Sequence, residues 1–314
     1  MTTIPWVEKY RPTNFNDIIL DENNNRIFSN ILKKNYFPNL LFYGPPGTGK
    51  TTTIINLIKA YQINNKQNSA GLLIHLNASD DRGIDVIRNQ ISVFVNSKTL
   101  FNSGIKFVIL DEVDYMTKNA QYAFKYLLQT YRTNVRFCLI CNYISRIDNS
   151  LQNEFIRIRF NQLPVNNIIN FITDIGVKEG LNIKPLEYLS IQKLYKSDIR
   201  SMINYMQSNQ YNINKYNIVD DKMCKNILGL FKTKSSKEIS DSIIITSKTY
   251  NIEIQNIIKN LFSFIIKNYT SLITPDLLNN IRLLMHSETP NLNYMLVFSV
   301  EIILLLLKSV SEPL

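Results

Sequence analysis

LLFYGPPGTGKTTTIINLIKA, residues 40–60, decides the fold of this chain. An unbroken apolar run ends at the pattern Gly44-x4-Gly49-Lys50-Thr51, and a helical pattern follows at once. Glycines let the backbone curl until its N–H groups face phosphate oxygens, and the start of the helix adds partial positive charge. The stretch therefore predicts a phosphate-binding loop between a strand and a helix.

We expect this loop to bind the triphosphate of a nucleotide. Lys50 should bridge the β- and γ-phosphates, and the hydroxyl of Thr51 should bind Mg²⁺. The expected nucleotide ligands are consecutive residues of the loop and the first helical turn: Gly44, Pro45, Pro46, Gly47, Thr48, Gly49, Lys50, Thr51 and Thr52.

The stretch FVILDEVD, residues 107–114, supplies the acidic half of such a site. An apolar strand ends at Asp111, which we expect to hold Mg²⁺ through water, beside Thr51. Glu112 is the candidate general base that orients the attacking water, and Asp114 is interpreted as a structural neighbour. ATP and Mg²⁺ are therefore the expected cofactors.

Short apolar runs alternate with helical patterns over the first 160 residues. The runs are residues 39–43, 72–77, 107–112 and 136–142. Unbroken runs of this kind usually lie inside a parallel sheet covered on both faces, so residues 1–160 are predicted to form an α/β layered domain. Beyond them the patterns are helical. Residues 161–222 are predicted to form a small helical lid, and residues 223–314 an all-α collar domain.

The composition argues against a membrane protein. The longest apolar run, MLVFSVEIILLLL, is interrupted by Glu301, and the N-terminus has no signal pattern, so we expect no membrane partner. Cys138 and Cys141 form a CxxC, but they lie inside a strand pattern, which favours core thiols over a zinc or redox site. The net charge is +10, and residues 1–160 hold 19 basic but 12 acidic side chains, which suits a polyanionic partner.

Three further stretches narrow the class of nucleotide-binding protein. Asn142 ends a strand beside the strand of Asp111, where it can sense the γ-phosphate or hold the water. Arg200 begins a helix of the predicted lid and can reach over the phosphates. Residues 5–12, PWVEKYRP, place aromatic and basic side chains where they can pack on the nucleotide base. Asn142 and Arg200 join Lys50 and Glu112 as candidate catalytic residues, and Arg200 is also a candidate nucleotide ligand.

Together these stretches resemble the small subunits of replication factor C, which are AAA+ sliding-clamp loaders. The resemblance covers nearly the whole chain and rests on PWVEKYRP, YGPPGTGKTT, LNASDDRGIDVIR, ILDEVDYMT, AQYA, RFCLICNY and SDIRSMIN, in that order. It implies an ATPase domain, a lid and a collar that joins five different subunits in an open spiral. It also implies ATP-driven loading of a ring-shaped sliding clamp onto primer-template DNA.

The resemblance implies that the excess basic charge of residues 1–160 contacts DNA. In such a spiral, helices that face the central channel follow the DNA backbone, and phosphate contacts position the duplex without reading its sequence. Arg82 and Arg88 are the candidate DNA-binding residues, and Lys98 and Lys106 are weaker candidates. An alternative is that Arg88 only pairs with Asp85.

One position departs from the family in a way that matters for function. Small subunits carry Ser-Arg-Cys near the end of the ATPase domain, where the arginine reaches the ATP of the next subunit. Here the aligned residues are Asn153, Glu154 and Phe155, so a carboxylate replaces the arginine finger. Arg157 and Arg159 follow in a strand pattern and are assigned to structure or DNA. A subunit at one end of the spiral has no ATP site on its far side. An intact nucleotide site without an arginine finger therefore fits such an end position.

Several alternatives stay open at this stage. Lys125, Tyr126 and Gln129 replace two arginines and a glutamate of the family, which predicts weaker coupling to DNA, and Ser197 replaces a glycine. The chain can be a regulatory subunit that binds ATP with little turnover, or another AAA+ DNA machine, namely a checkpoint clamp loader or branch-migration helicase. A small-molecule kinase ranks last, because residues 161–222 contain Arg200 as their one arginine. The family implies the nucleus, and a viral source would imply a cytoplasmic replication compartment.

Overall fold

The computed structural model describes residues 4–67, 71–79, 84–97, 104–131, 135–210, 221–250, 252–270, 273–285 and 292–309. The chain divides into two compact units, residues 1–210 and residues 211–314. The first unit contains the phosphate-binding loop and the second is helical. The finer division of the first unit into an ATPase domain and a lid domain stays a prediction.

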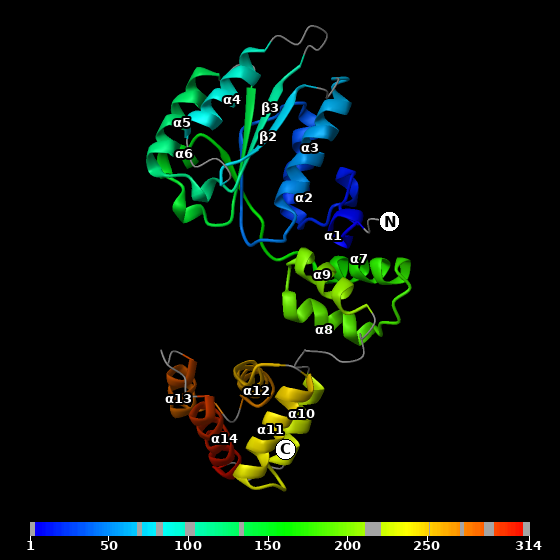
Figure 1. Cartoon of the computed structure of the whole chain (residues 1–314), viewed down its shortest axis with the longest axis vertical. Helices are drawn as coiled ribbons and strands as arrows, with labels where there is room; N and C mark the ends of the chain where they lie inside the picture. The colour runs from blue at the N-terminus through cyan, green and yellow to red at the C-terminus, as the bar shows by residue number, and fades with distance from the viewer. Residues whose placement is uncertain are drawn as a thin grey trace. The chain divides into compact units, whose positions relative to one another are not determined.

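A parallel sheet of five strands forms the centre of the first unit (Figure 1). The strands are β1 (Leu40–Tyr43), β2 (Leu73–Asn77), β3 (Lys106–Asp111), β4 (Val135–Cys141) and β5 (Ile156–Arg159). Their order across the sheet is β2-β3-β4-β1-β5, and every neighbouring pair is parallel. The predicted α/β fold and its four strands are confirmed, although β2 lies at one edge of the sheet and is only partly buried.

Helices cover both faces of this sheet (Figure 1). One face packs on α2 (Glu22–Lys34) and α3 (Lys50–Asn64), and the other packs on α4 (Ile84–Asn96) and α5 (Lys118–Thr130). Apolar side chains from alternate strand positions fill the two cores separately, as the period of two in a strand requires. The shorter helices of this part are α1 (Trp6–Lys9), η1 (Phe15–Asp17), η2 (Val113–Tyr115), η3 (Ile144–Arg146) and α6 (Asn149–Gln152).

The two cysteines of the CxxC pattern lie on opposite faces of β4. Cys138 packs in the core beneath α3, whereas Cys141 packs in the core beneath α5. Both are buried free thiols, and burial raises the pKa of Cys141 to about 12. The interpretation as core thiols is confirmed, and the described residues hold no cluster of side chains suited to a metal site.

Helices α7 (Val165–Lys178), α8 (Pro185–Tyr195) and α9 (Ile199–Ser208) complete the first unit and are called the lid below. They bury a small core of their own that includes Ile172, Ile191 and Met202. The linker between β5 and α7 is fastened to the lid, because the N–H of Leu163 donates to the hydroxyl of Ser197 at 2.9 Å. The serine that replaces a family glycine therefore has a structural partner.

The second unit is described by itself and is helical throughout its described residues. It consists of α10 (Asp221–Leu230), α11 (Ser236–Tyr250), α12 (Ile254–Asn268), α13 (Pro275–Met285) and α14 (Leu292–Ser309). Its core gathers around α12 and α14, with Phe262 and Ile303 fully buried. In the part of the chain that the structure describes, no helix has the length and apolar character needed to cross a membrane.

Candidate nucleotide-binding site

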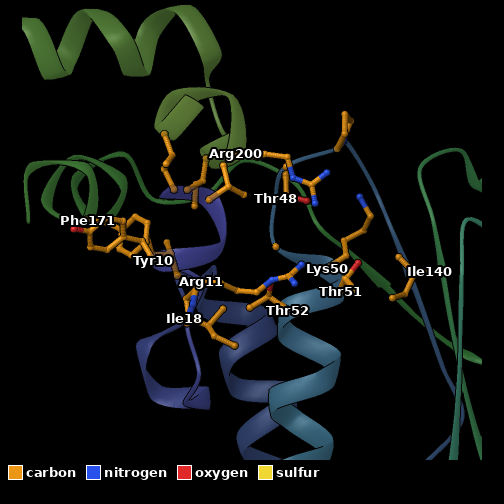
Figure 2. A pocket seen from close by; sticks show the side chains of 18 of the residues that line it. Tyr10, Arg11, Ile18, Thr48, Lys50, Thr51, Thr52, Ile140, Phe171 and Arg200 are labelled. Carbon is orange, nitrogen blue, oxygen red and sulfur yellow. The ribbon is translucent and has the colours of Figure 1, made fainter. Parts of the chain in front are cut away.

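A cavity of about 260 Å³ lies where β1, β3 and β4 end (Figure 2). These strands are neighbours in the sheet, so the loop after β1, Asp111 at the end of β3 and Asn142 after β4 converge on one place. Ligands of open α/β sheets bind at such carboxyl ends. The lid, residues 5–12 and the short stretch of residues 17–19 supply the remaining walls.

Most of the predicted loop residues line this cavity. They are Pro46, Gly47, Thr48, Gly49, Lys50, Thr51 and Thr52. Gly44 and Pro45 lie behind them and contribute backbone carbonyls. Gly44 has a φ of +138°, and a Cβ there would lie 1.9 Å from the carbonyl oxygen of Phe160, so this position requires glycine.

Lys50 lies at the centre of the loop. Its Nζ donates to the carbonyl oxygens of Gly44 and Pro45, each at 2.8 Å, and to Oδ1 of Asn142 at 2.9 Å. Burial lowers the pKa of Lys50, and the charge of Asp111 opposes that shift. Three oxygen acceptors therefore contact the ammonium group of Lys50, and one of them belongs to Asn142, which follows β4.

Thr51 and Asp111 form the second pair at the site. The hydroxyl of Thr51 donates to Oδ2 of Asp111 at 2.8 Å. Burial acts against the charged form of Asp111, but the neighbouring His75, Thr51 and the N–H of Glu112 outweigh it, so the pKa of Asp111 lies below its ordinary value. His75 comes from β2 and places Nε2 3.7 Å from the same oxygen. The pair offers two hard oxygen ligands side by side.

Glu112 lies in the cavity wall with an unusual backbone conformation. Its φ is +56°, in the left-handed region that residues with a Cβ seldom adopt. The N–H of Glu112 donates to Oδ1 of Asp111 at 2.9 Å, which fixes the turn at the end of β3. Strained residues of this kind concentrate at functional sites, where the surrounding structure holds them.

Asp114 connects the ends of β3 and β4. Its Oδ2 accepts hydrogen bonds from the N–H groups of Asn142 and Tyr143, both at 3.3 Å, and the side chain is buried. This contact places Asn142 where it can reach Lys50. The interpretation of Asp114 as a structural neighbour agrees with these bonds.

The lid contacts the loop directly. The N–H of Ile199 donates to the carbonyl oxygen of Gly47 at 3.2 Å, and Asp198 caps α9 by accepting from Ser201 at 3.0 Å. Arg200 follows and lines the cavity from the lid side, as Figure 2 shows. The structure therefore brings the four candidate catalytic residues, Lys50, Glu112, Asn142 and Arg200, to one cavity.

Comparison with known proteins identifies the family. Residues 40–163 match the family described as "ATPase family associated with various cellular activities (AAA)". The chain is 41% identical over 207 residues to "Replication factor C subunit 3" of Schizosaccharomyces pombe, and 40% identical over 205 residues to "Replication factor C subunit 5" of Homo sapiens. It is also 36% identical over 252 residues to "Probable replication factor C subunit 5" of Caenorhabditis elegans, an alignment that covers 77% of this chain and 67% of that relative.

The chain belongs to the replication factor C subunit family. The resemblance drawn from the motifs is thus confirmed. The alignments to the Schizosaccharomyces and human relatives cover 66% and 65% of this chain and 60% of each relative. This replication factor C chain therefore spans about 60% of the length of those curated relatives.

Four residues of this replication factor C chain were expected to contact DNA; the structure leaves three of these expectations untested and contradicts the fourth. Arg82 and Lys98 lie outside the described residues, and Arg88 lies on α4 with its side chain outside them. Lys106 was expected to be a weaker DNA candidate, and that expectation is wrong. Its Nζ donates to the carbonyl oxygens of Phe94, Val95 and Ser97 at 2.6, 2.9 and 2.6 Å, so it fastens the end of α4.

Glu154 lies between α6 and β5 and does not line the cavity of this replication factor C chain. It is half-buried, and its N–H donates to the carbonyl oxygen of Leu151 at 3.1 Å. Arg157 and Arg159 are exposed on β5 on either side of the buried Ile158, so both point to the same side of this edge strand. All three side chains are therefore outside the chain's own nucleotide site.

Four residues that sequence reasoning did not single out also contribute to the site of this replication factor C chain. His75 reaches Asp111 because the register pairs Asn77 with Asp111 across β2 and β3, and a strand assignment alone does not give that register. Tyr10 and Arg11 line the cavity, although only their segment as a whole was expected there. Glu179 holds Tyr10 from the lid, and no local pattern around Glu179 signals this contact.

Proposed function

We propose that this chain binds ATP with Mg²⁺ and hydrolyses it as a subunit of a sliding-clamp loader. One observation carries the proposal: a single cavity brings together the Lys50–Asn142 contact, the Thr51–Asp111 contact and Arg200 of the lid. Membership of the replication factor C family supports the assignment to clamp loading. The activity, substrates and partners below all form part of this proposal.

The residues present fit a nucleotide with its metal. The oxygens now around Lys50 would give way to phosphate oxygens, which stabilise the ammonium more strongly than neutral carbonyls do. Thr51 and Asp111 are 2.8 Å apart and supply the oxygen ligands that Mg²⁺ prefers, with room left for water and phosphate. When bound, Mg²⁺ would neutralise charge that develops on the phosphates.

Each residue has a distinct part in the proposed reaction. Lys50 holds the β- and γ-phosphates, and the backbone N–H groups of the loop hold the rest of the triphosphate. Glu112 orients the attacking water and accepts its proton. Asn142, fixed by Asp114, lies against Lys50 and hydrogen-bonds the γ-phosphate or the water. Arg200 reaches the phosphates from the lid and so couples the orientation of the lid to the nucleotide that is bound.

Partners complete this proposal. The chain would join other clamp-loader subunits in a hetero-pentamer and act on a ring-shaped clamp and primer-template DNA, with Arg82 and Arg88 at the DNA backbone. It would work in the nucleus, or in a cytoplasmic replication compartment if its source is viral. Since Glu154 stands at the finger position, this chain would not complete the ATP site of a neighbour in the usual way.

A second candidate function rests on the same glutamate. An arginine finger is worth about three to five orders of magnitude in related phosphoryl transfer, and a carboxylate would repel a γ-phosphate. With Glu154 at that position the chain can serve as a regulatory, scaffolding subunit that binds ATP itself but leaves the ATP site of its neighbour without a finger. The complete set of Lys50, Thr51, Asp111 and Glu112 favours the catalytic function.

Nucleotide binding by the purified chain tests the first step. We expect a fluorescent ADP analogue to bind wild type in the presence of Mg²⁺, and Lys50→Ala to weaken binding at least about tenfold because the main phosphate contact is lost. Thr51→Ala should remove most of the Mg²⁺ dependence. Lys33→Ala, on the exposed C-terminal turn of α2, is the matched control and should bind like wild type. Equal binding by Lys50→Ala and wild type would contradict the assignment of the loop.

A further inference from the structure

Residues 5–12, called the N-terminal segment below, are fastened to the lid. The N–H of Trp6 donates to Oε1 of Gln207 on α9 at 3.0 Å. Lys9 forms an ion pair with Glu179 at 2.6 Å, and the hydroxyl of Tyr10 donates to the same Oε1 atom. One carboxylate oxygen at the end of α7 thus holds two consecutive side chains of the segment.

The same segment is also fastened to the helix that follows the phosphate-binding loop. Nε of Arg11 donates to the hydroxyl of Thr52 at 3.3 Å, and Nδ2 of Asn56 donates to the carbonyl oxygen of Pro12 at 2.9 Å. Thr52 and Asn56 both belong to α3. The segment therefore connects the lid to the phosphate-binding helix.

Between these two attachments the segment forms a wall of the cavity. Tyr10, Arg11 and Pro12 all line it, and Figure 2 shows Tyr10 and Arg11 beside Phe171 of the lid and Thr52 of α3. The ring of Tyr10 is flanked by the ammonium groups of Lys9 and Lys178, at 5.3 and 5.9 Å from its centroid. The wall is therefore positioned by side chains that lie outside the cavity.

Glu179 is the residue on which this arrangement converges. Its side chain is 16% exposed, and it follows α7 as the residue that ends the helix. Hydrogen bonds from Lys9 and then from Tyr10 hold the pKa of Glu179 below its ordinary value, so the carboxylate is charged at neutral pH. Glu179 itself does not line the cavity.

We infer that Glu179 is a positioning residue of the nucleotide site, which fixes the Tyr10–Pro12 wall by holding Lys9 and Tyr10 against the lid. The inference rests on the proposed nucleotide binding and adds a residue that sets affinity from outside the cavity. Without Glu179, Lys9 and Tyr10 lose their shared acceptor, and the nucleotide must order the wall when it binds. Lys50, Thr51 and Asp111 keep their own contacts, so the catalytic geometry is unchanged.

The effect should therefore fall on binding and leave the chemical step alone. We expect Glu179→Ala to weaken nucleotide binding about three- to tenfold, which is the range for the net contribution of a typical hydrogen bond. In a turnover assay KM should rise by the same factor while kcat stays within twofold. Glu179→Gln keeps an acceptor oxygen and should recover most of the affinity. Asp174→Ala, an exposed carboxylate on the same helix, is the control and should match wild type.

The single tryptophan gives a direct reporter of the attachment. Trp6 is the one tryptophan of the chain, it lies on the segment and it is 6% exposed. Acrylamide quenching of its fluorescence should decrease when ADP and Mg²⁺ bind to wild type. In Glu179→Ala without nucleotide the quenching should be stronger than in wild type, and nucleotide should restore part of the protection.

The outcomes separate this inference from the proposed function. Weaker binding by Glu179→Ala, with rescue in Glu179→Gln and a KM effect alone, supports the inference. If wild type binds the ADP analogue and Glu179→Ala binds it equally well, the inference is wrong and the proposed function stands. If wild type and Lys50→Ala both fail to bind, the proposed function fails and this inference fails with it.

Discussion

Replacing Gly47 by alanine tests how the lid rests on the phosphate-binding loop. Gly47 has a φ of +71°, so alanine there carries a left-handed strain of about 1–2 kcal/mol. Its Cβ would also lie 1.7 Å from Oδ1 of Asp198, so that carboxylate must move away. Ser201 would then lose the cap on its N–H, which is worth about 1 kcal/mol. We therefore expect Gly47→Ala to lower the free energy of unfolding by about 2–3 kcal/mol.

A double-mutant cycle separates the two contributions. In an Asp198→Gly background the carboxylate is already absent, so Gly47→Ala should cost about 1–2 kcal/mol and the coupling should be about 1 kcal/mol. Chemical denaturation followed by circular dichroism measures this, using the transition whose midpoint shifts with ADP, since the two units can unfold separately. Costs that add within about 0.3–0.5 kcal/mol would refute the contact between the lid and Gly47.

Three other substitutions probe separate parts of the chain. Asn142→Ala removes the side-chain partner of Lys50 and should lower the single-turnover rate constant of ATP hydrolysis about 100- to 1,000-fold, with a small change in ATP affinity; an unchanged rate constant would argue against its role. Lys106→Met should lower the free energy of unfolding by about 1–3 kcal/mol, because three backbone acceptors lose a charged donor, while DNA affinity of the complex stays the same. A fall in DNA affinity without a loss of stability would restore Lys106 as a DNA contact. Glu154→Arg should leave nucleotide binding by this chain unchanged, since Glu154 lies outside its cavity; altered binding by the isolated chain would contradict that placement.

Local patterns were sufficient to predict the sheet and the core of the site. Strands ending at Tyr43, Asp111 and Cys141 follow from unbroken apolar runs, and parallel strands must place their carboxyl ends at one edge. The glycine pattern then fixes the loop, and the cavity contains Lys50, Thr51 and Asp111 as expected. These features depend on residues that are close together in the sequence, so local sequence patterns are enough to predict them.

Contacts between distant segments could not be predicted in this way. Tyr10 and Glu179 are 169 positions apart, and neither lies in a pattern that points to the other. Lys106 begins a buried strand, and its charge suggested a solvent-exposed DNA contact, whereas the carbonyls at the end of α4 satisfy its donors. The residue type of Lys106 indicates its charge but not whether its side chain is buried. Burial is what determines the role of this lysine.

The central claim is that this chain is a working ATPase within a clamp loader. The most direct test is ATP turnover by the complex reconstituted with partner subunits from the same genome, with and without the clamp and primed DNA. We predict that Lys50→Ala in this chain removes part of the turnover stimulated by DNA. If turnover and its stimulation were the same with Lys50→Ala as with wild type, this subunit would not hydrolyse ATP, and the catalytic account would be wrong.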